Sequence, residues 1–170
     1  MRNFVFLLLI CAVIAGAGAL EANQSPPVLK LGNEQLMGEY HYLIEGKRVG
    51  LVTNQSGVTS RGKSTIDLLL EDPSTSLTAL YGPEHGIDGT AKAGEYVESY
   101  MHSELGLPVY SLYGKTRMPS EEMLRDIDML LFDIQDIGAR SYTYMSTLNY
   151  CMIAAQKYNK PIVVLDRPNP

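Results

Sequence analysis

The chain has 170 residues, a formal charge of −5 and no clustered run of lysine and arginine. This acidic balance argues against nucleic acid as a partner, because a polyanion is bound through a basic patch. The length suffices for one domain of ordinary size with its own core.

The first residues are typical of an export signal. A single arginine precedes the apolar run Phe4–Ile14, and Ala17 and Ala19 give the small-residue pattern of a signal-peptidase site. We expect residues 1–19 to be a signal peptide and 20–30 a flexible leader, with an uncleaved membrane anchor as the alternative. The mature protein is then exported, periplasmic or extracellular, with no stable membrane association after cleavage.

Apolar runs alternate with helical patterns from residue 31 to the end of the chain. The runs predict strands over 47–53, 76–81, 107–113, 128–134 and 161–165, and helices over 64–71, 120–127 and 143–158. The run 128–134 is apolar on both faces, which indicates an interior strand. The alternation predicts an α/β fold, Rossmann-like, with a mostly parallel sheet and helices on both faces.

Finer features of these elements are also expected. Ser64 and Ser120 are suitable N-caps for the first two helices. The third helix is expected to bury one apolar stripe, made of Met145, Leu148, Met152 and Ala155. Residues 86–104 show no period and are expected to form a long surface loop. Cys151 would be the only mature cysteine, so no intrachain disulfide is expected and the apolar core must stabilise the fold.

Polar side chains follow the predicted strands. They are Asn54 after the first strand, Glu84 and His85 after the second, Asp133, Gln135, Asp136, Arg140 and Tyr142 after the fourth, and Asp166 and Arg167 after the fifth. The carboxyl ends of parallel strands meet at one edge of a sheet, and ligands bind there in open α/β folds. The sequence therefore predicts a polar site at this edge.

Glu84 is the strongest candidate for chemistry. Gly82, Pro83 and Gly86 favour a sharp turn that would hold the Glu84 carboxyl over the sheet edge. Partial desolvation there would raise its pKa and suit a general acid or base, whereas a solvated turn residue is the alternative. His85 is a candidate substrate contact, a turn residue or, less in keeping with the three scattered histidines, a metal ligand.

The carboxylates after the fourth strand leave several roles open. Asp133 and Asp136 can hold a divalent cation, contact sugar hydroxyls or pair with Arg140, and Asp133 can also end its strand by binding local amides. Arg140 presents a planar fork suited to a ligand carboxylate or to Asp136. Tyr142 lies close enough to the strand end to contact a sugar. No structural zinc pattern is present, so no metal or cofactor is predicted.

Several ordered motifs resemble one family. They are Gly50-Leu51-Val52-Thr53-Asn54, Tyr81-Gly82-Pro83-Glu84-His85-Gly86, Leu107-Pro108-Val109-Tyr110-Ser111-Leu112-Tyr113-Gly114, Phe132-Asp133-Ile134-Gln135-Asp136-Ile137-Gly138-Ala139-Arg140 and Leu165-Asp166-Arg167-Pro168-Asn169-Pro170. Together they resemble the exo-β-N-acetylmuramidases, formerly catalogued as a domain of unknown function. Long motifs in a fixed order are far more specific than one short pattern.

The resemblance implies a Rossmann-like N-terminal domain, a smaller C-terminal domain and an active site between them. It implies release of N-acetylmuramic acid from non-reducing ends of peptidoglycan fragments, with Glu84 and His85 catalytic and the other polar edge residues binding substrate. Residues 31–170 would be an incomplete N-terminal catalytic domain, since family members are longer and the C-terminal domain is missing here. The alternatives are a non-catalytic binder of peptidoglycan-derived muramyl saccharides and a metal-dependent hydrolase using Asp133, Asp136 and His85.

Overall fold

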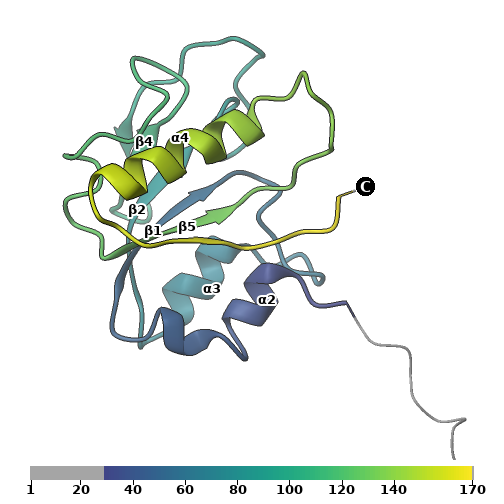
Figure 1. The fold of residues 1–170 in the computed structure, drawn as a ribbon, viewed down its shortest axis with the longest axis vertical. Coiled ribbons are helices and arrows are strands. Elements are labelled where there is room, and N and C mark those ends of the chain that lie inside the picture. The colour runs from purple at the N-terminus through teal and green to yellow at the C-terminus, as the bar shows by residue number, and fades with distance from the viewer. Residues whose placement is uncertain (1–28, 170) are drawn as a thin grey trace, which may run out of the picture.

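The computed structural model describes residues 29–169, so the predicted signal peptide and most of the predicted leader lie outside the described residues. A six-stranded sheet forms the centre of the molecule, in the order β3-β4-β2-β1-β5-β6 (Figure 1). Its strands are β1 (Arg48–Thr53), β2 (Ser76–Gly82), β3 (Tyr100–Met101), β4 (Pro108–Ser111), β5 (Met129–Asp133) and β6 (Ile162–Val164). Only the short edge strand β3 pairs antiparallel to its neighbour; the other pairs are parallel.

The order of the parallel strands is that of a Rossmann-like sheet. The chain begins in the middle with β1, moves outward through β2 and β4, then returns to the other side of β1 with β5 and β6. The direction of winding therefore reverses between β1 and β5. In folds of this kind, ligands bind in a crevice at the carboxyl ends of the two strands where the winding reverses. The predicted fold class is confirmed.

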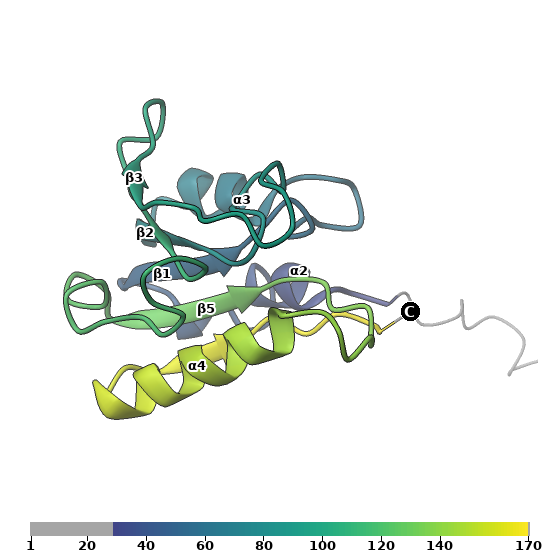
Figure 2. The ribbon, with the colours of Figure 1, turned by 90° about the horizontal axis from the view of Figure 1, so that it is seen from above.

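Helices cover both faces of the sheet (Figures 1 and 2). One face carries α2 (Gly32–Leu36), the 3₁₀ turn η1 (His41–Leu43) and α3 (Thr65–Glu71), and the other carries α4 (Tyr144–Lys157). Side chains alternate along β1, so Val49 and Leu51 pack on the α2/α3 side and Val52 on the α4 side. All three are fully buried, which makes β1 the middle of two separate apolar layers.

The predicted helix over 120–127 is wrong, because the chain makes only turns there. The amide of Leu124 is shared between the carbonyls of Ser120 and Glu121, both at 3.2 Å. Leu124 and Ile127 are completely buried under α4, and the segment enters β5 directly afterwards. So short a piece gains too few helical hydrogen bonds to offset nucleation, and packing sets its shape instead.

The predicted buried stripe of α4 is also wrong in part. The buried residues are Thr147, Cys151, Ala154 and Ala155, whereas Met145 and Met152 are 57% and 50% exposed. Small side chains on the buried face let α4 lie close to the sheet. Met145 and Met152 therefore remain outside, whereas Leu148 is partly buried against the core.

The other helix and strand predictions agree with the structure within a few residues. Ser64 caps α3, and its Oγ accepts a hydrogen bond of 3.0 Å from the amide of Asp67. The loop between β2 and β4 is long, as predicted, apart from the two residues of β3. Neither α2 nor η1 was predicted. Within residues 29–169, no helix is long and apolar enough to span a bilayer.

Candidate functional site

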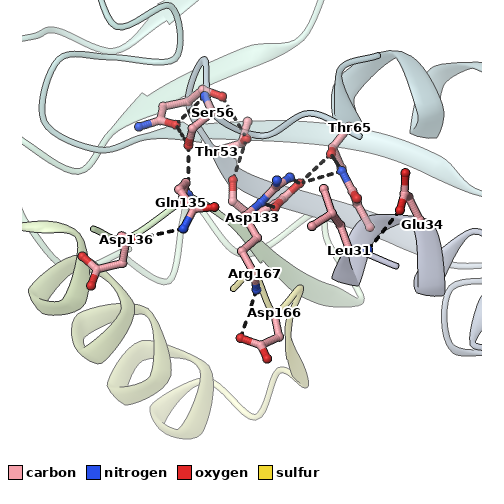
Figure 3. Close-up of polar contacts among 12 residues, drawn as sticks. Leu31, Glu34, Thr53, Ser56, Thr65, Asp133, Gln135, Asp136, Asp166 and Arg167 are labelled. Carbon is pink, nitrogen blue, oxygen red and sulfur yellow. Dashed lines mark hydrogen bonds and ion pairs between the residues drawn. The ribbon is translucent and has the colours of Figure 1, made fainter. Parts of the chain in front are cut away.

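A buried ion pair closes the sheet edge on the α2/α3 face. Asp133, at the end of β5, is completely buried, and both of its oxygens accept from Arg167: Nε to Oδ1 at 2.6 Å and Nη2 to Oδ2 at 2.9 Å (Figure 3). The side chain of Arg167 is only 5% exposed. Such a two-point pair is strong where water is excluded. Asp133 and Arg167 were both predicted to bind substrate, but this pairing leaves neither side chain at the surface.

Two more side chains complete this pair. Thr65 Oγ1 donates to Asp133 Oδ2 at 2.5 Å, and Asn33 Nδ2 lies 2.8 Å from Thr65 Oγ1 and 3.4 Å from the same carboxylate oxygen. The network therefore joins α2, the start of α3, the end of β5 and the segment after β6. Asp133 pairs with neither Arg140 nor local amides, the partners that the sequence suggested. The contacts of Asp133 are therefore structural and hold these four segments together.

The neighbouring polar residues hold the segment after β6 in place. Gln135 Nε2 donates to the carbonyls of Asp136 and Pro168 at 2.8 and 2.9 Å. Asp136 Oδ2 accepts from the amide of Gly138 at 3.0 Å, which forms a local turn. The exposed Asp166 accepts from the amide of Arg167.

Arg140 and Tyr142 lie exposed on the loop before α4. Within residues 29–169 no ion pair joins Arg140 to Asp136, so that suggested bridge is not formed. A pocket of about 240 Å³ lies nearby between β5, β6 and α4. Tyr144, Asp136 and Asp166 line it, with mostly apolar side chains around them.

Glu84 sits on a strained turn at the end of β2. The amide of Gly86 donates to the carbonyl of Pro83 at 3.0 Å, and His85, the third residue of the turn, has a φ of 73°. Glycine is usual at this position of a type II turn, since a side chain there is crowded by the backbone. Left-handed residues other than glycine cluster at functional sites, where surrounding contacts hold them.

Two donors hold the Glu84 carboxylate. Thr143 Oγ1 donates to Oε2 at 2.8 Å, and the amide of Gly94 donates to Oε1 at 3.0 Å. Partial burial raises the pKa of Glu84, but the hydrogen bonds from Thr143 and Gly94, with the nearby Tyr113 hydroxyl, lower it by more, so the net pKa lies below its ordinary value. The expectation of a raised pKa is therefore wrong in this structure. Desolvation acts as predicted, yet the donors outweigh it.

His85 is held by its own backbone neighbourhood. Its Nδ1 lies 2.7 Å from the carbonyl oxygen of Ala91, whose amide in turn donates to the His85 carbonyl. A carbonyl only accepts, so Nδ1 carries the hydrogen, and in the neutral ring Nε2 has the lone pair. The ring therefore keeps one nitrogen for a substrate group.

Asn54, at the end of β1, is buried with one unused donor. It is 5% exposed, and its Oδ1 accepts from the amide and the hydroxyl of Ser56 at 2.9 and 2.6 Å. An amide N–H only donates, so this contact fixes which end of the Asn54 side chain is oxygen. Nδ2 is buried and has no hydrogen-bond partner among the described residues. A buried donor left unpaired costs about 1–3 kcal/mol.

Thr143 and Tyr144 were not predicted as site residues. Thr143 is the N-cap of α4, but its hydroxyl donates to Glu84 instead of capping its own helix. Burial raises the pKa of Tyr144, the neighbouring Asn54 side chain lowers it and the charge of Glu84 raises it. Its ring also meets the Tyr142 ring edge-on at 6.3 Å. Only the fold brings these groups together.

A Ser-His-Asp cluster lies elsewhere and has the wrong geometry for a nucleophile. Asp72 Oδ2 and Ser74 Oγ contact the same ring nitrogen of His41, Nε2, at 2.7 and 3.3 Å. A catalytic triad needs the carboxylate and the hydroxyl on different nitrogens. Within residues 29–169, no three His, Cys, Asp or Glu side chains gather as metal ligands, so Asp133, Asp136 and His85 do not converge.

Known proteins match this chain over most of its length. It is 46% identical to the peptidoglycan β-N-acetylmuramidase NamZ of Bacillus subtilis (strain 168), over all of this chain and 43% of that protein. A crystal structure of a DUF1343 family protein from Bacteroides fragilis NCTC 9343 matches with a TM-score of 0.75 and 55% identity, over 83% of this chain and 35% of that one. A second from the same organism gives 0.68 and 33%, over 85% and 36%.

The chain therefore spans less than half the length of the curated relative that it matches. The family profile described as exo-β-N-acetylmuramidase NamZ, N-terminal, matches residues 49–170. These residues include every strand of the sheet except the first residue of β1, and all of the polar edge. On this match, the chain belongs to the exo-β-N-acetylmuramidase NamZ family and corresponds to its N-terminal part.

Proposed function

We propose that this chain supplies the catalytic carboxylate of a glycoside hydrolase that releases N-acetylmuramic acid from the non-reducing ends of peptidoglycan fragments. The observation that carries the proposal is Glu84, held at the carboxyl edge of the sheet by Thr143 and Gly94 beside a strained His85. The Bacillus subtilis relative, named a peptidoglycan β-N-acetylmuramidase, supports the choice of substrate. Export to the periplasm or cell exterior, proposed from residues 1–19, would place the protein with this substrate.

The geometry defines the state of Glu84 before substrate binds. Because its pKa is lowered, Glu84 is ionised at neutral pH and can act as a base or nucleophile. A sugar seated over the carboxylate would exclude water and raise its pKa, which is what proton donation to the leaving oxygen requires. His85 Nε2 would contact the sugar from the same turn.

Glycosidases of this kind ordinarily use two carboxyl groups. Among the partners suggested for Glu84, Asp133 is enclosed by Arg167 and offers no oxygen to a sugar. Asp136 and Asp166 line the pocket beside α4 and remain candidates on this chain. The exposed Arg140 and Tyr142 lie on the loop that leads to Thr143, in reach of a substrate extending from the edge.

The test is chromophore release from a β-N-acetylmuramide by the complete gene product, compared with its Glu84→Gln variant. We expect kcat to fall by a factor of about 10²–10⁴ or more, the range for loss of an acid–base group. Glu104→Gln, at an exposed position away from the edge, is the matched control and should leave kcat unchanged.

Two results would overturn the proposal. One is full activity in the Glu84→Gln variant, and the other is no release by the wild-type protein, which would favour a non-catalytic binder. Activity that disappears with a chelator and returns with a divalent cation would favour the metal-dependent alternative.

A further inference from the structure

The α4 face of the sheet edge contains a hydrogen-bond donor that is buried, oriented and unused. Asn54 Nδ2 has no partner among the described residues, while Oδ1 is held by both donors of Ser56. Ser56 is fixed in turn, because its hydroxyl accepts from the amide of Gln135 at 2.9 Å (Figure 3). The Asn54 amide therefore cannot turn over to satisfy Nδ2. The Nδ2 end of the side chain points away from Ser56 and is free to donate to an acceptor on a ligand.

The position of this donor relative to Glu84 follows from the sheet. β1 and β2 pair with Val52 opposite Tyr81, so Asn54 lies level with Pro83, one residue before Glu84. Thr143 ties Glu84 to the start of α4, and Tyr144 is the next residue. Tyr144 is influenced by both the Asn54 side chain and the charge of Glu84. The Asn54 amide, the Tyr144 phenol and the Glu84 carboxylate therefore lie near one another at the carboxyl ends of β1 and β2, beside the start of α4.

The charges decide what can occupy this place. A partner for Asn54 Nδ2 must be an acceptor, and a phenol hydroxyl can donate a second hydrogen bond to the same atom. A carboxylate would meet the negative Glu84 and be repelled. A neutral carbonyl oxygen accepts two hydrogen bonds without that repulsion. An alcohol oxygen fits less well, because its single hydrogen must also find an acceptor.

We propose that Asn54 and Tyr144 form a subsite beside Glu84 for a neutral carbonyl oxygen, that of the 2-acetamido group of the sugar. The assignment rests on the proposed function and adds its specificity: the enzyme would select 2-acetamido sugars at this point rather than through the lactyl carboxylate. Asn54 and Tyr144 then hold the sugar so that its anomeric bond lies over Glu84.

The experiment compares two chromogenic substrates in the complete gene product: the β-N-acetylmuramide and its analogue with a hydroxyl in place of the 2-acetamido group. Tyr144→Phe removes only the phenol oxygen, and Asn54→Ala removes the amide. Each variant is expected to lower kcat/KM for the acetamido substrate by about tenfold or more, the value of one hydrogen bond. The analogue should be affected little, so the preference for the acetamido substrate falls.

The controls separate this result from general damage. Tyr150→Phe changes another tyrosine of α4, one that is 38% exposed, and should leave the preference unchanged. For a substrate that keeps the acetamido group but lacks the lactyl ether, Tyr144→Phe should lower kcat/KM by the same factor as for the parent substrate. The reason is that the lost contact is to the acetamido carbonyl. If the subsite variants lower kcat/KM equally for the β-N-acetylmuramide and its 2-hydroxy analogue, or do not lower it at all, the subsite is overturned.

The outcome is distinguishable from failure of the proposed function. If Glu84→Gln is inactive but the substrate preference survives both subsite variants, the function stands and the subsite does not. If the wild-type protein releases no chromophore, the same ratios are measured as dissociation constants for N-acetylmuramic acid and its 2-hydroxy analogue. Equal affinity for the two sugars, or binding of neither, would then overturn the subsite.

Discussion

The two faces of one sheet edge are built differently. On the α2/α3 face, Asp133 and Arg167 are buried and fully paired, with Thr65 and Asn33 filling the same network. On the α4 face, Glu84 is half-buried, Asn54 keeps an unused donor and His85 is held in a left-handed conformation. Both faces carry acidic residues that follow strands. The charged pair on the first face is enclosed and holds segments of the fold together, although Asn33 Oδ1 there is buried without a partner among the described residues. On the second face, a partly exposed carboxylate lies beside an unpaired donor, and this arrangement suits a ligand.

The largest expected effect is on the closed face. Arg167→Gln would leave Asp133 charged and buried without its partner, which destabilises a protein by about 3–5 kcal/mol. Urea unfolding of the variant and the wild-type protein measures this difference. Arg48→Gln is the matched control, since Arg48 and Asp128 pair at the surface with 49% and 40% exposed side chains. Equal effects of the two substitutions would remove the distinction between the faces.

The strained turn on the open face gives a smaller effect. His85→Gly and His85→Ala both delete the ring, but only glycine accepts the φ of 73° without crowding. The glycine variant is therefore expected to be more stable than the alanine variant by about 1–2 kcal/mol. Thermal unfolding compares them. Equal stability would mean that the turn relaxes and that position 85 carries no strain.

A still smaller effect concerns the pH dependence of Glu84. Its pKa is below the ordinary value, so its contribution to stability is present above the ordinary pKa and lost as pH falls through the folded pKa. Thr143→Val removes a donor that lowers the pKa, so both the loss of stability and the acidic limb of the rate profile should move to higher pH. Carboxyl NMR titration measures the pKa directly. Ser146→Ala, one turn into the same helix, should not shift it.

The strands could be predicted because apolar runs of the right length are separated by clear turn residues. The same alternation gave the Rossmann-like class, and strand ends gave the polar edge. What the sequence could not show is the face on which each polar side chain lies. Asn54 follows β1 toward α4, while Asp133 ends β5 toward α2 and α3, and this depends on the pleat of the folded strands.

Pairing over long distances was equally hidden. Arg140 is close to Asp133 in sequence, yet Arg167 reaches it from beyond β6. Thr143 reads as an ordinary helix start, and its bond to Glu84 exists only because α4 begins over the end of β2. Residues 31–45 gave no prediction, because α2 and η1 are too short for a period to emerge.

Gly32 has a consequence for how the chain is made. Its amide donates to the carbonyl of Asp166 at 2.8 Å, and a Cβ there would lie 2.3 Å from the Asp166 nitrogen. The first helix of the described residues thus docks against a segment that is synthesised long after it. During synthesis, α2 cannot pack against the segment after β6 until that segment has emerged. The α2/α3 face therefore closes only after residue 167 has left the ribosome. The nascent protein therefore stays receptive to chaperones until its synthesis has passed this point.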